Sequence, residues 1–286
     1  MKVLLLGANG QLGWELQRSC PGEIQLITCD YPKIDFCSKT SINECLNTSQ
    51  PDFIINSAAY TNVDLAEQES QTAFKVNHDA VADIAQYAVQ NNIRLVHIST
   101  DYVFNGKNHK PWALDDTPCP ESVYGKSKLK GEIAIQEILK DKALIIRTAW
   151  LYSSHGKNFV KTMLKLMAEK NRLNIVDDQI GTPTWAYGLS KVIWKFVEQK
   201  LSGLFHWTDA GVASWYDFAV AIQEEALAIG LISKTIPILP IPSKQFPTPA
   251  KRPFYGILDK NYTWKTIEIT PVHWQIQLRA MLKELN

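Results

Sequence analysis

Three evenly spaced glycines near the N-terminus constrain the fold of this chain more than any other feature. Gly7, Gly10 and Gly13 form the pattern G-x-x-G-x-x-G, directly after an apolar run at residues 2–6 and before a stretch with helical spacing. In a strand–turn–helix unit the first glycine permits a tight turn, the second lets the backbone approach a pyrophosphate, and the third allows close packing. Backbone N–H groups at the start of such a helix hold phosphates. The context therefore predicts a dinucleotide-binding turn rather than a turn without a ligand.

Strand and helix patterns alternate through the first half of the chain. Short apolar runs predict strands at residues 2–6, 24–29, 53–56, 93–98 and 143–146. Helical spacing of apolar residues occupies the intervals between them, at residues 10–20, 40–50, 70–91 and 124–139. Strands that alternate with helices form right-handed βαβ units and a parallel sheet. We therefore expect an α/β fold with a Rossmann-like doubly wound parallel sheet.

The alternation weakens after about Trp150. Further helices are expected at residues 157–170, 185–200 and 214–230. Six prolines among the 17 residues from Pro237 to Pro253 exclude a helix interior, and the interspersed apolar residues predict an ordered, extended segment. We expect residues 1–149, with part of about 180–210, to form the dinucleotide-binding domain. Residues of about 150–179 and 211–286 would form a smaller substrate-binding domain, which we place as a lid over the strand ends.

Composition limits the partners and the compartment. The chain has 30 basic and 29 acidic residues, and a net charge of +1 provides no bulk attraction to nucleic acid or to an acidic membrane. No apolar run approaches the roughly 18 residues that a membrane helix needs. Five cysteines, an odd number without a C-x-x-C pair, favour a reducing cytoplasm over a disulfide scaffold or a zinc site. We predict a cytoplasmic protein without a metal site and without a nucleic-acid or membrane partner.

An acidic residue follows the second predicted strand. Asp30 lies 23 residues after Gly7, close to the spacing of about 20 residues at which an acid bonds the adenosine ribose. Its charge would repel a 2′-phosphate and so favour NADH, although Lys33 nearby weakens that argument. The alternative interpretation of Asp30 is an ordinary turn residue. Both NADPH and NADH are therefore candidate cofactors.

A tyrosine and a lysine four residues apart begin the helix predicted at residues 124–139. Tyr124 and Lys128 share one helix face, and a positive charge beside a phenol lowers the phenol pKa. Such a pair can exchange a proton near neutral pH. By itself Y-x-x-x-K is common and usually marks a surface tyrosine and a solvated lysine. Within a dinucleotide-binding fold we interpret the pair as catalytic.

A hydroxyl group ends the fourth predicted strand. Thr100, in the segment Ser99-Thr100-Asp101, lies at the strand ends where open α/β sheets bind ligands. The hydroxyl could donate a hydrogen bond to a substrate carbonyl. Serine and threonine in such places more often satisfy backbone groups, which is the alternative interpretation.

These motifs resemble the extended short-chain dehydrogenase/reductase superfamily. Together with Y-x-x-x-K, four further segments resemble its dTDP-4-dehydrorhamnose reductase family, in order and over nearly the whole chain: residues 99–104, 147–152, 178–184 and 249–253. The resemblance implies NAD(P)H-dependent reduction of the C4 ketone of dTDP-4-dehydro-L-rhamnose. The product would be dTDP-L-rhamnose, a donor for bacterial surface polysaccharide such as the lipopolysaccharide O antigen.

The resemblance also implies roles for individual residues. Cofactor contacts would come from the glycine loop, from the adenosine side and from the loop after the third strand: Gly7, Gly10, Gln11, Leu12, Gly13, Asp30, Asp35, Phe36, Ala59, Tyr60 and Thr61. The catalytic set would be Thr100, Tyr124 and Lys128. Tyr124 and Lys128 would also contact the cofactor, with Lys128 lowering the Tyr124 pKa and holding the nicotinamide ribose. Thr100 would polarise the substrate carbonyl. The sugar nucleotide would contact Asp101, Trp150, Asn158 and Arg252.

Differences from the motifs of related enzyme families distinguish this function from the alternatives. Tyr102 follows the Thr-Asp pair where sugar-nucleotide 4,6-dehydratases carry a glutamate, and a 4-epimerase would retain its cofactor through the cycle. A reductase of a different dTDP-4-keto sugar, of the dihydrostreptose synthase type, is an open alternative. So is a non-catalytic NADP-binding regulatory subunit like that of methionine adenosyltransferase, which the intact catalytic set argues against.

One difference from the family pattern bears on the oligomeric state. Some members use a carboxylate after the segment matched at residues 178–184 for a magnesium-linked dimer contact. Here Trp185, Ala186 and Tyr187 follow, and none of them is acidic. This argues against a metal-bridged dimer, and we expect a monomer or a homodimer.

Overall fold

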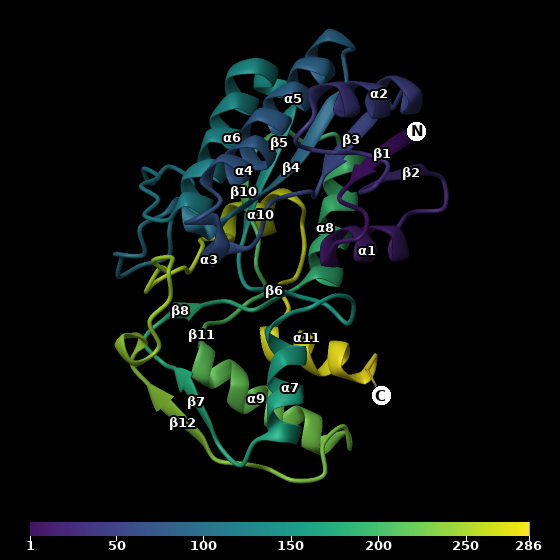
Figure 1. Cartoon of the computed structure of the whole chain (residues 1–286). Helices are drawn as coiled ribbons and strands as arrows, with labels where there is room; N and C mark the ends of the chain where they lie inside the picture. Colours follow the sequence, from purple (N-terminus) through teal and green to yellow (C-terminus); the bar gives the residue numbers. More distant parts are fainter. Residues whose placement is uncertain (286) are drawn as a thin grey trace.

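The computed structural model describes residues 1–285 and contains a central six-stranded parallel sheet. The strand order is β10-β5-β4-β3-β1-β2 (Figure 1). The strands are β1 (Lys2–Leu6), β2 (Gln25–Cys29), β3 (Phe53–Asn56), β4 (Arg94–Thr100), β5 (Ala143–Thr148) and β10 (Gly203–His206). Because β1 lies between β2 and β3, the direction of the crossovers reverses beside it, and ligands bind at such a point. The predicted Rossmann-like fold class is confirmed.

Helices cover both faces of this sheet. Along β1, Val3 and Leu5 pack in the core beneath α1 (Gln11–Arg18) and α8 (Ala186–Glu198). Leu4 and Leu6 pack in the opposite core, beneath α2 (Lys39–Ser49), α5 (Ala80–Gln90) and α6 (Val123–Leu139). Successive side chains of a strand point to opposite faces, so a strand covered on both sides has to be apolar throughout. This explains the continuous apolar runs in the sequence.

The helix expected at residues 70–91 is divided in three. It consists of α4 (Ser70–Phe74), a π-helical turn η1 (Lys75–Asp79) and α5. The buried Asn77 in η1 bonds the backbone N–H and carbonyl of Tyr60 and the hydroxyl of Ser127. The π-turn therefore ties the loop after β3, which also carries α3 (Val63–Ala66), to the helix that holds Tyr124 and Lys128.

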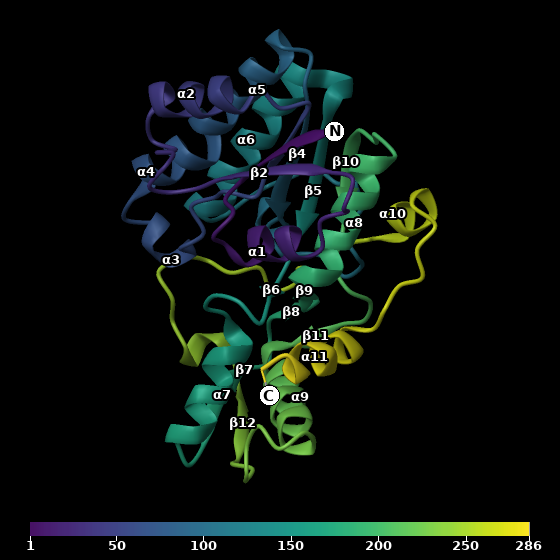
Figure 2. The same cartoon turned by 90° about the vertical axis from the view of Figure 1, so that its right-hand side faces the viewer.

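A second group of elements lies at the carboxyl ends of the sheet strands (Figures 1 and 2). Its helices are α7 (Phe159–Glu169), α9 (Trp215–Ala228) and α11 (Trp274–Lys283). Its paired strands are β6 (Leu151–Tyr152) with β9 (Thr184–Trp185), β7 (Leu173–Val176) with β12 (Ile238–Ile241), and β8 (Ile180–Gly181) with β11 (Ala213–Ser214). A separate apolar core holds them together. The proline-rich segment is extended, as predicted, through β12 and the short turn η4 (Ser243–Gln245).

The sequence did not predict the outer strand β10, which is covered by a segment near the C-terminus. Phe205 of β10 stacks on Tyr262 of α10 (Asn261–Thr266), with ring centroids 5.4 Å apart. Ile267, just after α10, belongs to the core of the sheet, with Trp264 packed against it. These residues cover the outer edge of the sheet at β10. The expected domain boundaries stay predictions.

Within residues 1–285, none of the helices combines the length and the apolarity that crossing a membrane requires.

Candidate active site

A cavity of about 560 Å³ lies at the carboxyl ends of the central strands. It is lined by most of the residues singled out in the sequence: Gly7, Gly10, Gln11, Leu12, Gly13, Asp30, Phe36, Ala59, Thr61, Thr100, Asp101, Tyr124, Lys128, Trp150 and Asn158. Segments from both parts of the molecule therefore meet around one space. Its size is within the range of ordinary small-molecule sites.

Three predicted site residues do not line this cavity. Asp35 belongs to a local turn, where its carboxylate accepts the N–H of Cys37 at 2.8 Å. The Tyr60 hydroxyl is turned away from the cavity and donates to Glu69 at 2.8 Å. Arg252 forms an ion pair with Asp64 at 2.6 Å and also donates to the hydroxyl of Tyr102, which does line the cavity. These side chains are directed by contacts with residues outside the motifs, so the motifs alone do not reveal their directions.

The glycine loop fits a dinucleotide because its backbone is packed too closely for side chains. Gly7 has φ +80°, and a Cβ there would lie 2.5 Å from the backbone nitrogen of Ala58. A Cβ on Gly13 would lie 2.1 Å from the carbonyl oxygen of Gly7. Gly10 is the N-cap of α1 and provides no side-chain cap, and the first turn carries no acidic residue. This helix start is suited to accept the pyrophosphate of NAD(P).

Asp30 stands at the edge of the cavity with its carboxylate held in place. One oxygen accepts the backbone N–H of Asn9 at 2.8 Å, and the other accepts that of Tyr31 at 2.7 Å. Asp30 therefore closes the turn and also lines the cavity, and its contact with the adenosine ribose stays a prediction.

The hydroxyl and carboxyl groups after β4 form a compact polar cluster. The Thr100 hydroxyl donates to Asp101 at 3.1 Å and accepts the Tyr102 N–H at 3.2 Å. Burial raises the Asp101 pKa to about 7, although the hydrogen bond from Thr100 opposes the rise. Near neutral pH this carboxyl group can therefore donate a hydrogen bond as well as accept one.

The predicted lowering of the Tyr124 pKa is wrong for the protein by itself. Burial raises this pKa well above its usual range, and the hydrogen bond with Thr100 offsets only part of the rise. Lys128 does not lower it, because its ammonium-bearing end is directed elsewhere: Nζ donates to the carbonyl of Ile98 at 2.7 Å and lies 3.1 Å from His97 Nε2. Tyr124 is therefore a protonated phenol at neutral pH, which is the state that a proton donor needs.

Several cavity residues were not predicted from the sequence. They are Ser57, Ala58, Val63, Val76, Ile98, Ser99, Tyr102, Thr148, Ala149, Leu151 and Lys157. Most are apolar or small and serve as walls, so no chemical pattern distinguishes them. Lys157 is different because it brings a cation to the cavity beside Asn158. Surface lysines are common, so the sequence alone does not show that this lysine lies at a cavity.

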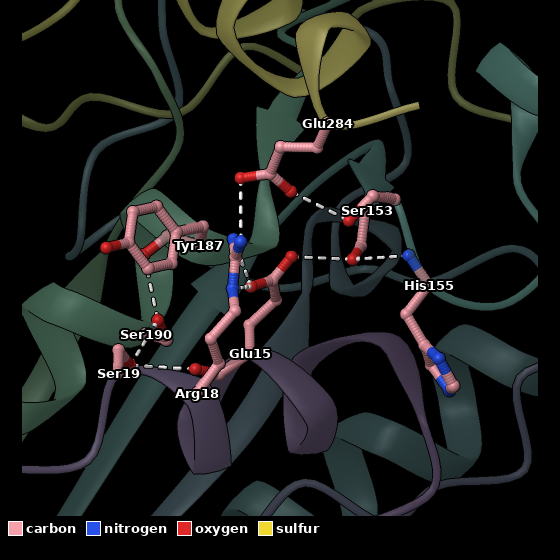
Figure 3. Close-up of polar contacts among 9 residues, drawn as sticks. Glu15, Arg18, Ser19, Ser153, His155, Tyr187, Ser190 and Glu284 are labelled. Atoms are coloured by element: carbon pink, nitrogen blue, oxygen red, sulfur yellow. Dashed lines mark hydrogen bonds and ion pairs between the residues drawn. The ribbon is translucent and has the colours of Figure 1, made fainter. Parts of the chain in front are cut away.

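A polar network, buried at Glu15 and Ser153, holds the segment that carries Asn158 against helix α1 (Figure 3). The Ser153 hydroxyl donates to the fully buried Glu15 at 2.7 Å and accepts the N–H of His155 at 3.0 Å. Arg18 lies between the carboxylates of Glu15 and Glu284, at 2.7 Å from each. Burial raises the Glu15 pKa against the pull of Ser153 and Arg18. The network joins the start of the dinucleotide fold to the end of the chain.

The described residues were also searched for metal ligands. Over residues 1–285, no three His, Cys, Asp or Glu side chains are grouped so that they could hold a metal ion.

The raised Asp101 pKa predicts a pH-dependent stability. Its folded value of about 7 exceeds the unfolded value of 3.8, so its stabilising contribution is full below pH 3.8 and is lost as pH rises through 7. Asparagine does not titrate, so the Asp101→Asn variant should lose less unfolding free energy than the unmodified chain between pH 5 and pH 8. One pKa unit corresponds to about 1.4 kcal/mol, so we expect a difference of about 2–3 kcal/mol. Urea unfolding of both proteins at the two pH values measures it, and equal losses would contradict the assignment.

Three features define the class of this protein. They are the doubly wound sheet, the glycine cradle (Gly7, Gly10 and Gly13) at the point where the crossovers reverse, and the Tyr-x-x-x-Lys helix beside β4. Together they define an NAD(P)-binding oxidoreductase of the extended short-chain dehydrogenase/reductase class. Comparison with known proteins narrows this class. The model of the family described as RmlD substrate binding domain matches residues 1–286, and the chain belongs to this family.

Similar proteins match over their whole length. The dTDP-4-dehydrorhamnose reductase of Escherichia coli is 37% identical, over 100% of this chain and 98% of that protein. The crystal structure of a dTDP-4-dehydrorhamnose reductase from Clostridium acetobutylicum superimposes with a TM-score of 0.93 at 38% identity, covering 100% of this chain and 99% of that one. The reductase of Bacillus anthracis in complex with NADP has a TM-score of 0.92 at 33% identity and covers 99% of each chain.

Proposed function

We infer that this chain reduces the C4 ketone of dTDP-4-dehydro-L-rhamnose with NAD(P)H to form dTDP-L-rhamnose, a step toward surface polysaccharide. One observation carries the inference. A single cavity joins a glycine cradle, a protonated Tyr124 and the Thr100 hydroxyl in a chain that full-length reductases resemble. The reductase of Bacillus anthracis was solved with NADP, and the residues of the cradle here suit the same kind of cofactor.

The proposed chemistry is shared among three residues of the cavity. When bound, the reduced nicotinamide supplies the hydride for the ketone carbon. Thr100 donates a hydrogen bond to the carbonyl oxygen, and Tyr124 gives its proton to that oxygen as negative charge develops. Lys128, buried at the base of the cavity, would hold the nicotinamide ribose.

The other wall of the cavity is proposed to bind the sugar nucleotide. Trp150 stacks on Trp215 with ring centroids 3.5 Å apart and an interplanar angle of 7°, which leaves it a rigid aromatic surface at the cavity. Asn158 is held by Gln11 and by the Ser153 carbonyl, and Lys157 beside it can attract a diphosphate. Arg252 is proposed to contribute through its hydrogen bond to Tyr102, which lines the cavity.

A direct assay tests this function. The purified chain is mixed with dTDP-4-dehydro-L-rhamnose and either NADPH or NADH, and the loss of reduced-nicotinamide absorbance is followed together with the sugar product. We expect oxidation that depends on the sugar nucleotide and yields dTDP-L-rhamnose. No oxidation, with both cofactors still bound, would overturn the assignment and favour a different keto sugar or a regulatory role.

Asp30 is predicted to discriminate between the two cofactors. Its carboxylate lines the cavity and would repel a 2′-phosphate, so Asp30→Asn should raise the ratio of kcat/KM for NADPH over NADH by about tenfold, which corresponds to about 1.4 kcal/mol. Asp52→Asn is a matched control, because Asp52 precedes β3 and bonds the Lys2 N–H outside the cavity. A ratio that moves equally in both variants, or in neither, would contradict the role of Asp30.

We also propose that the enzyme works in the cytoplasm. All five cysteines are free thiols, which suits a reducing compartment. That the protein is a monomer or a homodimer stays a prediction from the sequence.

A further inference from the structure

Helix α3 and the proline-rich segment meet at one carboxylate near the cavity. Asp64 of α3 accepts the backbone N–H of Ala250 through Oδ1 at 3.2 Å and pairs with the guanidinium of Arg252 through Oδ2 at 2.6 Å. We call residues 249–253 the strap. It leaves the second group of elements after η4 and passes beside α3 (Figures 1 and 2). One carboxylate therefore fastens the strap at two points.

The guanidinium of Arg252 carries this contact to the cavity. While Nη2 donates to Asp64, Nη1 donates to the hydroxyl of Tyr102 at 3.2 Å. A guanidinium is planar and rigid, so the position of one nitrogen sets the position of the other. Tyr102 lines the cavity from the 3₁₀ turn η2 (Asp101–Val103), directly after the strand end that carries Thr100. Asp64, which does not line the cavity, is thereby linked to a residue that does.

The chemistry of the donors sets the direction of hydrogen bonding at Tyr102. A guanidinium can only donate, so the hydroxyl oxygen uses a lone pair for Arg252 and keeps its proton for another acceptor. Burial raises the Tyr102 pKa to about 12 although Arg252 opposes the rise, so the proton is present at neutral pH. Tyr102 therefore offers a hydrogen-bond donor at the cavity.

The aromatic ring of Tyr102 is held against the proposed acid. Its ring meets that of Tyr124 edge to face, with centroids 5.5 Å apart and an interplanar angle of 76°. A Cβ on Gly125 would lie 2.2 Å from the Tyr102 carbonyl oxygen, so the start of α6 packs directly on this backbone. Such packing fixes the ring and its oxygen but leaves the O–H free to rotate. The donor on Arg252 then removes the orientations in which the proton points toward the strap.

We propose that Asp64 is a positioning residue, which through Arg252 directs the Tyr102 hydroxyl proton into the cavity, where it donates to an oxygen of the sugar nucleotide. Without the carboxylate, the strap loses both fastening points on α3, and the partly exposed guanidinium can turn to solvent. The Tyr102 hydroxyl can then turn its proton away from the cavity. The identity of the ligand rests on the proposed function.

The ion pair itself is expected to contribute little to folding. The side chains of Arg252 and Asp64 are 27% and 35% exposed, and ion pairs with this access to water are screened. Asp64→Asn keeps the size of the side chain, but the amide oxygen accepts from one strap donor while the NH₂ faces the other. We therefore expect the midpoint of urea unfolding to stay close to that of the unmodified chain. An effect on substrate binding would then not come from a damaged fold.

Steady-state kinetics test the proposal. A contact made equally to the bound substrate and to the transition state raises KM when it is lost and leaves kcat unchanged. We expect Asp64→Asn to raise KM for dTDP-4-dehydro-L-rhamnose about tenfold, as for the loss of one hydrogen bond, with kcat and the Kd of NADPH nearly unchanged. Glu121→Gln is the matched control, since Glu121 pairs with the neighbouring strap residue Lys251 at 3.9 Å and with Lys107 at 2.8 Å. An unchanged KM in Asp64→Asn, or an equal rise in Glu121→Gln, would overturn the proposal.

A double-mutant cycle shows whether Asp64 acts through the Tyr102 hydroxyl. Tyr102→Phe keeps a ring against Tyr124 and removes the donor, so it should also raise KM about tenfold. The two substitutions together should raise KM no further than one alone, because they remove the same contact. Effects that add in full would assign Asp64 a role independent of the hydroxyl and overturn the proposal.

Calorimetric titration with dTDP-L-rhamnose separates this inference from the proposed function. We expect the unmodified chain to bind it, and Asp64→Asn to bind it about tenfold more weakly. No binding by the unmodified chain would overturn the proposed function, and this inference with it. Binding that Asp64→Asn leaves unchanged would overturn the positioning role alone.

Discussion

Replacing Tyr124 with phenylalanine is expected to lower kcat about 10²–10⁴-fold, the usual range for losing a general acid. The Tyr124 hydroxyl lies at the cavity, is protonated at neutral pH and is hydrogen-bonded to Thr100. Affinity for NADPH should change little, because the glycine cradle and Asp30 lie on other elements.

Steady-state kinetics and direct titration with NADPH together measure this prediction. Tyr87→Phe is a matched control, since its hydroxyl bonds the Leu46 carbonyl on α2, away from the cavity, and its kcat should stay near that of the unmodified chain. If Tyr124→Phe kept its turnover, another group would have to be the acid. A large loss of cofactor affinity would instead assign the hydroxyl to binding.

Glu132→Gln is expected to reduce the free energy of unfolding by about 3–5 kcal/mol, because it leaves the buried guanidinium of Arg147 without a counter-charge. The two side chains are 1% and 3% exposed, and they share hydrogen bonds of 2.7 to 3.2 Å. Urea unfolding at pH 7 measures the loss.

Two companion variants show whether the charge is the cause. The pair Lys165–Glu169 is exposed and 3.9 Å apart, so Glu169→Gln should cost less than about 1 kcal/mol. Replacing both buried partners, Glu132→Leu with Arg147→Met, should recover much of the loss, because no charge then remains unpaired. A Glu132→Gln variant no less stable than Glu169→Gln would show that the buried pair contributes little.

The sheet could be predicted because its signals are local. Strands buried on both faces are apolar throughout, and the glycine spacing marks the turn after β1. β10 was missed because Gly203–His206 is a short run that becomes a strand only by pairing with β5. The cover that α10 provides for Phe205 was missed for the same reason.

In the candidate site, too, some features follow from local sequence signals and others depend on contacts between distant segments. Residues placed at strand ends, such as Thr100 and Asp30, line the cavity because the topology alone brings them there. The direction of the Tyr124 pKa shift was wrong because it depends on where Lys128 Nζ points, and His97 and the Ile98 carbonyl decide that. The bond from Ser153 to Glu15 spans 138 residues and leaves no pattern in the sequence.

One contact links the two halves of the cavity. Asn158 donates to Gln11 at 2.9 Å, and both side chains line the cavity, one from the side proposed to bind the sugar nucleotide and one from the side proposed to bind the cofactor. A ligand that binds one of these side chains changes the hydrogen-bonding groups that the other side chain presents to the second ligand. The two binding equilibria therefore share a coupling free energy, and whatever one ligand does to the affinity for the second, the second does equally to the affinity for the first.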